Sequence, residues 1–170
     1  MSAGPFYGKY RGTVINNIDP LMIGRIQAMV PDVAGLLPSS WATPCVPVAG
    51  IGMGVFAVPP VGAGVWIEFE RGDPDYPIWV GGYWGSAAEV PALAKAVPPG
   101  LAGITLQTTL QNGIVVSDTP GPTGGILIKT ASGAMVSLSD VGIVISNGKG
   151  AMISMTGSTT DVNAGALTIV

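Results

Sequence analysis

The second half of the chain repeats one short pattern, in which two apolar residues stand two positions apart and turn-forming residues follow. The seven pairs are Ile104/Leu106, Ile114/Val116, Ile126/Ile128, Val136/Leu138, Ile143/Ile145, Ile153/Met155 and Leu167/Ile169. Residues two apart lie on the same face of a β-strand. The repeat therefore predicts short strands joined by turns, the last and longest turn spanning residues 156–165. Its period is too short for propeller blades and favours a β-helix or β-prism.

One copy of the chain cannot bury such a repeat by itself. Each unit offers about two apolar side chains, worth roughly 1.5–3 kcal/mol apiece. Ordering its ten or so residues costs roughly 1.5 kcal/mol each. We therefore expect three chains to share one apolar axis, which would be lined by Ile126, Ile128, Val136, Leu138, Ile143, Ile145, Ile153 and Met155. A second sheet of a monomeric β-sandwich is the alternative.

The first half predicts a small all-β barrel or sandwich. Its aliphatic runs are short and Gly or Pro separates them, as is typical of strands between turns. We expect strands at residues 7–16, 25–30, 41–48, 55–58, 65–70 and 78–83. The composition then becomes rich in Ala and Pro. We therefore divide the chain into a first domain at residues 1–85, a linker at 86–103 with a possible helical turn, and a second domain at 104–170.

The composition excludes several kinds of chemistry. The 170 residues include no His and a single Cys, Cys45, so His-based catalysis and an intrachain disulfide are excluded. The net charge is −3 and the seven Lys and Arg form no cluster, which argues against nucleic acid. Glu68 and Glu70 are expected on one solvated strand face, and Cys45 is expected to be buried. We predict no catalytic residue, no cofactor and no metal site.

The stretch Val33–Ile67 carries no charge, yet five prolines argue against a membrane helix, and we expect it to form buried strands. The opening MSAGPFYGKYRG lacks the apolar core of a secretory signal. We therefore expect synthesis in the cytoplasm without a signal peptide.

Three short motifs lie in the segment from Trp41 to Gly85. They are Pro60-x-Gly62-x-Gly64-Val65, then Phe69-Glu70-x-Gly72-Asp73-Pro74-Asp75-x-Pro77, then Gly81. Gly62 and Gly64 suit a turn into a central strand, and Gly72, Asp73 and Pro74 suit a tight turn. With these motifs the segment resembles the OB-fold domain of contractile-tail spike proteins, namely the phage baseplate assembly protein V family and the spike half of VgrG proteins.

The resemblance implies an OB-fold barrel followed by an intertwined trimeric β-helix. It implies a structural, non-enzymatic central spike of a phage tail baseplate or bacterial injection system, which pierces the target envelope mechanically. The implied partners are a separate hub protein on the OB-fold side, baseplate wedge proteins and, transiently, the target membrane. A PAAR-like tip protein would sit on a platform made by Leu167, Ile169 and Val170. The alternative is an OB-fold oligosaccharide-binding module on a trimeric β-stalk.

Overall fold

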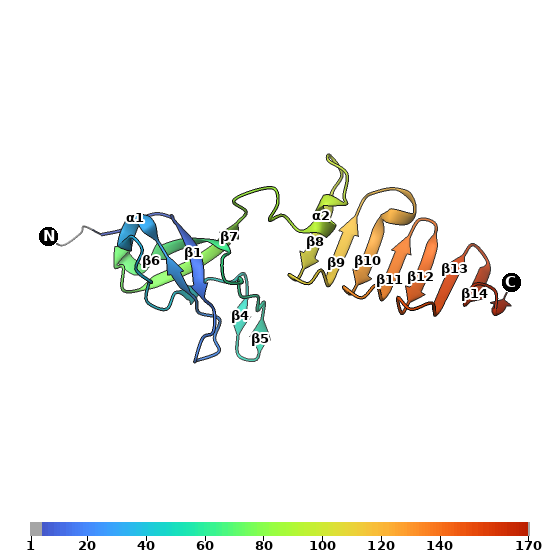
Figure 1. Ribbon diagram of the computed structural model, residues 1–170, viewed down its shortest axis with the longest axis horizontal. Coiled ribbons are helices and arrows are strands. Elements are labelled where there is room, and N and C mark those ends of the chain that lie inside the picture. Colours follow the sequence, from blue (N-terminus) through green and yellow to red (C-terminus); the bar gives the residue numbers. More distant parts are fainter. Residues whose placement is uncertain (1–4, 170) are drawn as a thin grey trace. The chain divides into compact units, whose positions relative to one another are not determined.

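The computed structural model describes residues 5–169, which form two compact units with the boundary between Ala87 and Ala88 (Figure 1). Both units consist mainly of β-strands, as the sequence predicts. None of the helices among the described residues is long and apolar enough to cross a membrane.

The first unit is built on a curved five-stranded sheet in the order β2-β1-β6-β7-β3. Its strands are β1 (Tyr10–Asn16), β2 (Gln27–Met29), β3 (Thr43–Pro44), β6 (Gly64–Phe69) and β7 (Pro77–Tyr83). All neighbours are antiparallel except β3 and β7. Register shifts in the β1–β2 pair and in the β6–β7 pair mark bulges in β1 and β7, which bend strands and help a sheet to close. This half-barrel is consistent with an OB fold.

The core of this unit lies on the concave side of the sheet. Side chains alternate along β6, so that Val65, Ile67 and Phe69 are all buried. They pack in one apolar cluster with Ile26, which directly precedes β2, and with Trp79 from β7. The short helix α1 (Pro31–Ala34) and the 3-10 helix η1 (Glu70–Gly72) complete the unit.

Two predicted strands of this unit differ from the structure. Residues 55–58 are not a strand; a small hairpin of β4 (Ala49–Gly50) and β5 (Met53–Gly54) precedes them. Its tight turn uses Gly52, whose φ is +70°. The strand predicted at 41–48 is reduced to β3, because Pro44 and Pro47 have no N–H to donate to a sheet.

The second unit is an eight-stranded antiparallel sheet in which every strand pairs with its neighbours in sequence (Figure 1). The strands are β8 (Gly103–Gln107), β9 (Gly113–Ser117), β10 (Gly125–Lys129), β11 (Met135–Ser139), β12 (Gly142–Ser146), β13 (Met152–Thr156), β14 (Thr159–Val162) and β15 (Leu167–Ile169). A 3-10 helix, η2 (Gly121–Thr123), precedes β10. The alternation of short strands and turns follows the apolar pairs of the sequence.

The start of this unit contains a short helix, α2 (Ala92–Lys95), which packs against β8 and β9. The backbone N–H of Leu93 donates a hydrogen bond to the side chain of Gln107, at 2.9 Å. The helix lies within the segment proposed as a linker, and contacts group it with the second unit.

The long turn predicted at residues 156–165 is wrong, because it contains strand β14. Thr160 occupies the place of an apolar residue in the repeat, where it pairs with Met155 and with Ile169. The unit of the repeat that forms β14 therefore has the pair Thr160/Val162. A search for two apolar residues two positions apart does not find it, because Thr160 is polar.

Candidate interaction surfaces

One face of the eight-stranded sheet is almost entirely apolar. Residues directly opposite each other on paired strands share a face, so the register defines two rows that cross all eight strands. The first row is Ile104, Val116, Ile126, Leu138, Ile143, Met155, Thr160 and Ile169; the second is Leu106, Ile114, Ile128, Val136, Ile145, Ile153, Val162 and Leu167. Thr160 is the one polar member. The eight predicted axis residues all lie on this apolar face.

The apolar face is not covered within one chain. The exposed members of the two rows range from 36% exposure at Met155 to 68% at Ile104. Among the described residues of the second unit, Val115 is the one buried apolar side chain. A sheet of this size without a core needs apolar surface from another source to be stable.

The opposite face mixes polar and apolar side chains, such as Leu127 and Val144, and is partly covered at one end. Its central positions on β11 and β13 are Ser137 and Ser154, which both pair with Val144 of β12. At the β8–β9 end, a Cβ added at Gly113 would lie 2.6 Å from Leu93 of α2. Helix α2 therefore covers this face at β8 and β9, while the apolar face has no such cover within one chain.

The last strand of the sheet, β15, is an edge strand in the described residues. Leu167 and Ile169 are more than half exposed on it. Val170, the third residue of the predicted tip platform, lies outside the described residues.

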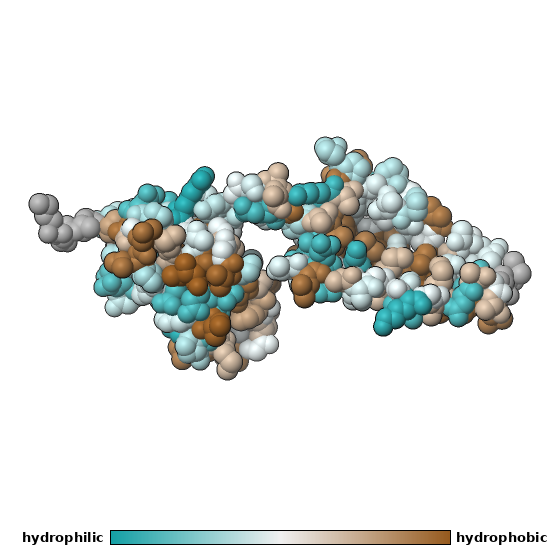
Figure 2. Space-filling view, in the orientation of Figure 1, coloured by the Kyte–Doolittle hydropathy of each residue, from teal (hydrophilic) through white to brown (hydrophobic). Residues whose placement is uncertain are grey.

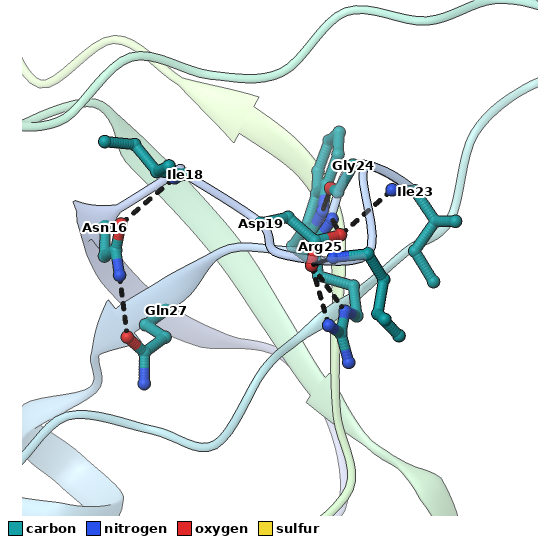
Figure 3. A network of polar contacts seen from close by, with 9 residues as sticks. Asn16, Ile18, Asp19, Ile23, Gly24, Arg25 and Gln27 are labelled. Carbon is teal, nitrogen blue, oxygen red and sulfur yellow. Dashed lines mark hydrogen bonds and ion pairs between the residues drawn. The ribbon is translucent and has the colours of Figure 1, made fainter.

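The β1–β2 loop in the first unit is organised by one buried carboxylate (Figure 3). The side chain of Asp19 is 4% exposed and accepts two hydrogen bonds from the Arg25 guanidinium, at 2.7 and 3.0 Å. It also accepts backbone N–H bonds from Leu21, Ile23 and Arg25. The Arg25 guanidinium and these N–H groups hold the pKa of Asp19 well below its ordinary value, against the effect of burial. The loop is thereby fixed while its apolar side chains point outward.

The segment that contains the β4–β5 hairpin packs beside this loop. A Cβ added at Gly24 would lie 3.2 Å from the Phe56 ring, and the amide of Asn17 donates to the carbonyl of Pro59. The Trp79 indole N–H donates to the Gly24 carbonyl at 3.0 Å. Between loop and hairpin lies an open pocket of about 300 Å³ that is lined by Ile23, Pro44, Val46, Met53, Phe56 and Trp79.

This surface was not predicted from the sequence. The charge-free stretch from Val33 to Ile67 was expected to be buried, yet Phe56 is 72% exposed and Ile51 is fully exposed at the hairpin tip. The available signal was the series Gly50, Gly52 and Gly54 within the charge-free stretch, because glycines at alternate positions favour an exposed turn over a buried strand. Cys45, also expected to be buried, is exposed.

The motif residues of the first unit lie at both ends of β6. Gly62 (φ +89°) is in the turn before this strand and Gly64 begins it, against the ring of Tyr83. Gly72 (φ +78°) and Asp73 lie in the connection to β7, where Asp73 accepts the backbone N–H of Asp75 across Pro74.

Glu68 and Glu70 do not form a pair on one strand. Glu68 lies on β6 and is ion-paired with Lys9, whereas Glu70 follows the strand in η1. The aromatic pair Trp66 and Tyr83 is occupied by the Arg11 guanidinium, 5.5 and 5.2 Å from the two ring centres. A sugar that stacked on these rings would have to compete with the Arg11 guanidinium.

Comparison with protein families accounts for both units. Residues 10–84 match the Type VI secretion system/phage-baseplate injector OB domain, and residues 103–168 match the phage baseplate V C-terminal trimerisation domain. A search of curated proteins found no match. An OB domain followed by a trimerising sheet defines a structural protein of an injection baseplate. The chain belongs to the phage baseplate V family, and its trimerisation domain explains why the second unit has no core within one copy.

Proposed function

We propose that this chain is the central spike of a contractile injection machine. The observation that carries the proposal is the uncovered apolar face of the second unit, in a domain whose family trimerises. Three such faces turned inward would make a closed prism with a dry interior. Ile126, Ile128, Val136, Leu138, Ile143, Ile145, Ile153 and Met155 would face its axis.

Such a prism suits a mechanical role. Each strand between β8 and β15 is hydrogen-bonded on both sides, so the sheet has open edges only at its two ends. Close packing of three apolar faces spreads an axial load over many side chains, each of which contributes little alone. The spike would pierce the target envelope without any chemical step, and its contact with the membrane would be brief.

The two ends of the chain would meet different partners. The OB unit would join a separate hub protein and the wedge proteins of the baseplate. At the other end, Leu167 and Ile169, with Val170, would form the platform for a PAAR-like tip protein. The exposed edge strand β15 supports this assignment, because uncovered apolar strand edges invite pairing.

The position of the chain in the particle tests the spike proposal. Assembled particles that carry a compact tag after Val170 would be imaged by electron cryomicroscopy. The tag is expected on the central axis at the distal point of the baseplate. A tag at the baseplate rim would contradict the spike proposal.

Removal of Ala166–Val170 tests the tip platform. The truncated chain is expected to remain a trimer by light scattering and to lose the tip protein in a pull-down. If the truncated trimer still binds the tip protein, the platform is elsewhere.

A further inference from the structure

The sheet of the first unit has two unlike ends. At the end where β6 passes into β7, near the pair Phe69–Pro77, the chain gathers Lys9, Glu68, Glu70, Arg71, Asp73 and Asp75. The other end is marked by the paired residues Thr13, Gly64 and Tyr83. Here lie the β1–β2 loop (residues 17–24) and the hairpin segment (residues 46–58), which we call the apolar end.

The apolar end exposes hydrophobic side chains and no free charge. Its one ionisable residue is Asp19, which is buried on Arg25. Met22 is 83% exposed and Phe56 is 72% exposed. The other exposed members are Ile18, Leu21, Ile23, Val48, Ile51, Met53 and Val55. Several hydrophobic residues gather on this part of the first unit in Figure 2. A contiguous apolar surface without charge is typical of the centre of a protein interface.

The apolar end lies where the chain leaves the first unit. Strand β7 ends there at Tyr83, and the second unit takes up the chain with α2 at Ala92. The eight residues between them, 84–91, span at most about 27 Å when fully extended. In a trimer held by the second units, three apolar ends are therefore tethered near one another. A short tether gives an effective concentration on the order of millimolar.

We propose that the apolar ends of neighbouring OB units pack against one another in the trimer, loop 17–24 of one copy against segment 46–58 of the next. Threefold symmetry requires two different surfaces on each copy, and the apolar end has them. The hairpin tip at Ile51 projects, whereas the pocket between loop and hairpin is recessed. Neither surface would bury an unpaired charge. The inference rests on the proposed trimer. In this arrangement the charged end of each OB unit would stay free to bind the hub protein.

Amide hydrogen exchange on the full-length chain tests this inference. The β4–β5 hairpin has only two paired positions per strand, so its amides should exchange quickly unless a neighbour covers them. We expect slow exchange over residues 46–58 in the wild-type trimer. Ile145→Asp, on the apolar face of the second unit, should break the trimer, and in its soluble monomers these amides should exchange at least tenfold faster. Val144→Asp, on the opposite face, should leave the slow exchange unchanged.

A second pair of variants keeps the trimer and changes only the first unit. Met22→Glu places a charge in the loop and should accelerate exchange over residues 46–58 at least tenfold. Tyr76→Glu changes a similarly exposed residue at the charged end and should have no effect there.

Two results would overturn the inference: equally fast exchange over residues 46–58 in the wild-type trimer and the monomer, or equally slow exchange in both. If Ile145→Asp remains a trimer by light scattering, the assignment of the stalk interface fails instead. The Met22→Glu and Tyr76→Glu pair then decides the inference alone.

Discussion

Asp19 shows how one buried side chain shapes the surface around it. Its carboxylate satisfies three backbone N–H groups and the Arg25 guanidinium, which in turn lies over the Trp41 ring at 5.3 Å. With these groups satisfied inside the loop, apolar residues such as Met22 can occupy its outer side. Met22 has a positive φ of 53°, a conformation that the hydrogen bonds around Asp19 help to hold.

The low pKa of Asp19 predicts how the first unit responds to acid. Folding lowers this pKa below the unfolded value of about 3.9, so the stabilisation is complete above about pH 5 and is lost as the pH falls through and below about 4. All four tryptophans lie between residues 41 and 84, so their fluorescence reports on this unit alone. We expect Asp19→Asn to lower the melting temperature by several degrees at pH 7. The difference should begin to shrink as the pH falls below about 4, and most of it should remain at pH 3, because the folded-state carboxyl is still ionised there. A difference that is independent of pH would contradict this assignment.

Thr160 is the one polar residue in the two rows of the apolar face. Its cross-strand neighbours on this face, Met155 and Ile169, are apolar. Burying three hydroxyl groups in such surroundings costs stability. Thr160→Val, which keeps the shape, should therefore stabilise the trimer by about 1 kcal/mol per chain. Thermal unfolding followed by circular dichroism measures the change, with Thr159→Val on the other face as control. A lower melting temperature for Thr160→Val would show that the hydroxyl has a necessary partner in the trimer.

At the scale of the element, close approach of backbones decides which turn glycines are indispensable. Gly125 begins β10 with a φ of +77°, and a Cβ there would lie 2.0 Å from the Leu138 carbonyl. Gly150 has a φ of +103° and no atom within 4 Å of its Cβ position. Both substitutions to Ala incur the cost of a left-handed conformation, about 1–2 kcal/mol. Gly125→Ala should cost clearly more, since the β10–β11 pair must also open. Equal shifts in the unfolding midpoint would refute this.

Element prediction succeeded where the pattern is local. Strands β1, β6 and β7, and seven of the eight strands of the second unit, follow from alternation and turn residues. Strand β14 was missed because Thr160 breaks the apolar pattern while the backbone pairing continues through it. The hairpin β4–β5 was missed because its paired residues, Ala49, Gly50, Met53 and Gly54, have low β-propensity. The turn at Gly52 brings them together instead.

At the scale of the whole molecule, the two faces of the second unit predict opposite responses to charge. Ile145→Asp would place three carboxylates in the trimer interior, each costing several kcal/mol without a partner. Val144→Asp makes the same kind of change between Ser137 and Ser154 on the other face. Size-exclusion chromatography with light scattering should show dissociation or aggregation for Ile145→Asp and a trimer for Val144→Asp. A stable Ile145→Asp trimer would place the interface elsewhere.

The sheet also predicts the length of the spike. From β8 to β15 there are seven strand spacings of about 4.8 Å, or about 34 Å in all. Electron microscopy of the trimer should show a stalk of this length. A stalk of twice that length would mean that the strands do not run across the axis.

The sequence by itself determined the all-β class and the need of the second unit for partner chains. These properties depend on the spacing of apolar residues and on composition, and both can be read from short segments of the chain without knowing which segments pack together. The motifs around Gly62, Gly64 and Gly72 were sufficient to indicate the OB domain. The eight residues predicted to line the trimer axis share one face of the sheet because alternation along a strand fixes the direction of side chains.

Only the tertiary structure decided what lies on the surface of the first unit. Hydropathy placed the stretch from Val33 to Ile67 in the interior, but the core of the half-barrel is filled by nine buried residues, among them Ile26, Val65 and Trp79. The hairpin tip at Ile51 is left outside. The apolar end also depends on contacts between residues far apart in sequence, such as Gly24 with Phe56 and with Trp79. The volume of the core limits how many apolar residues the fold can bury, and the remaining ones stay exposed. Hydropathy along the chain does not specify that volume.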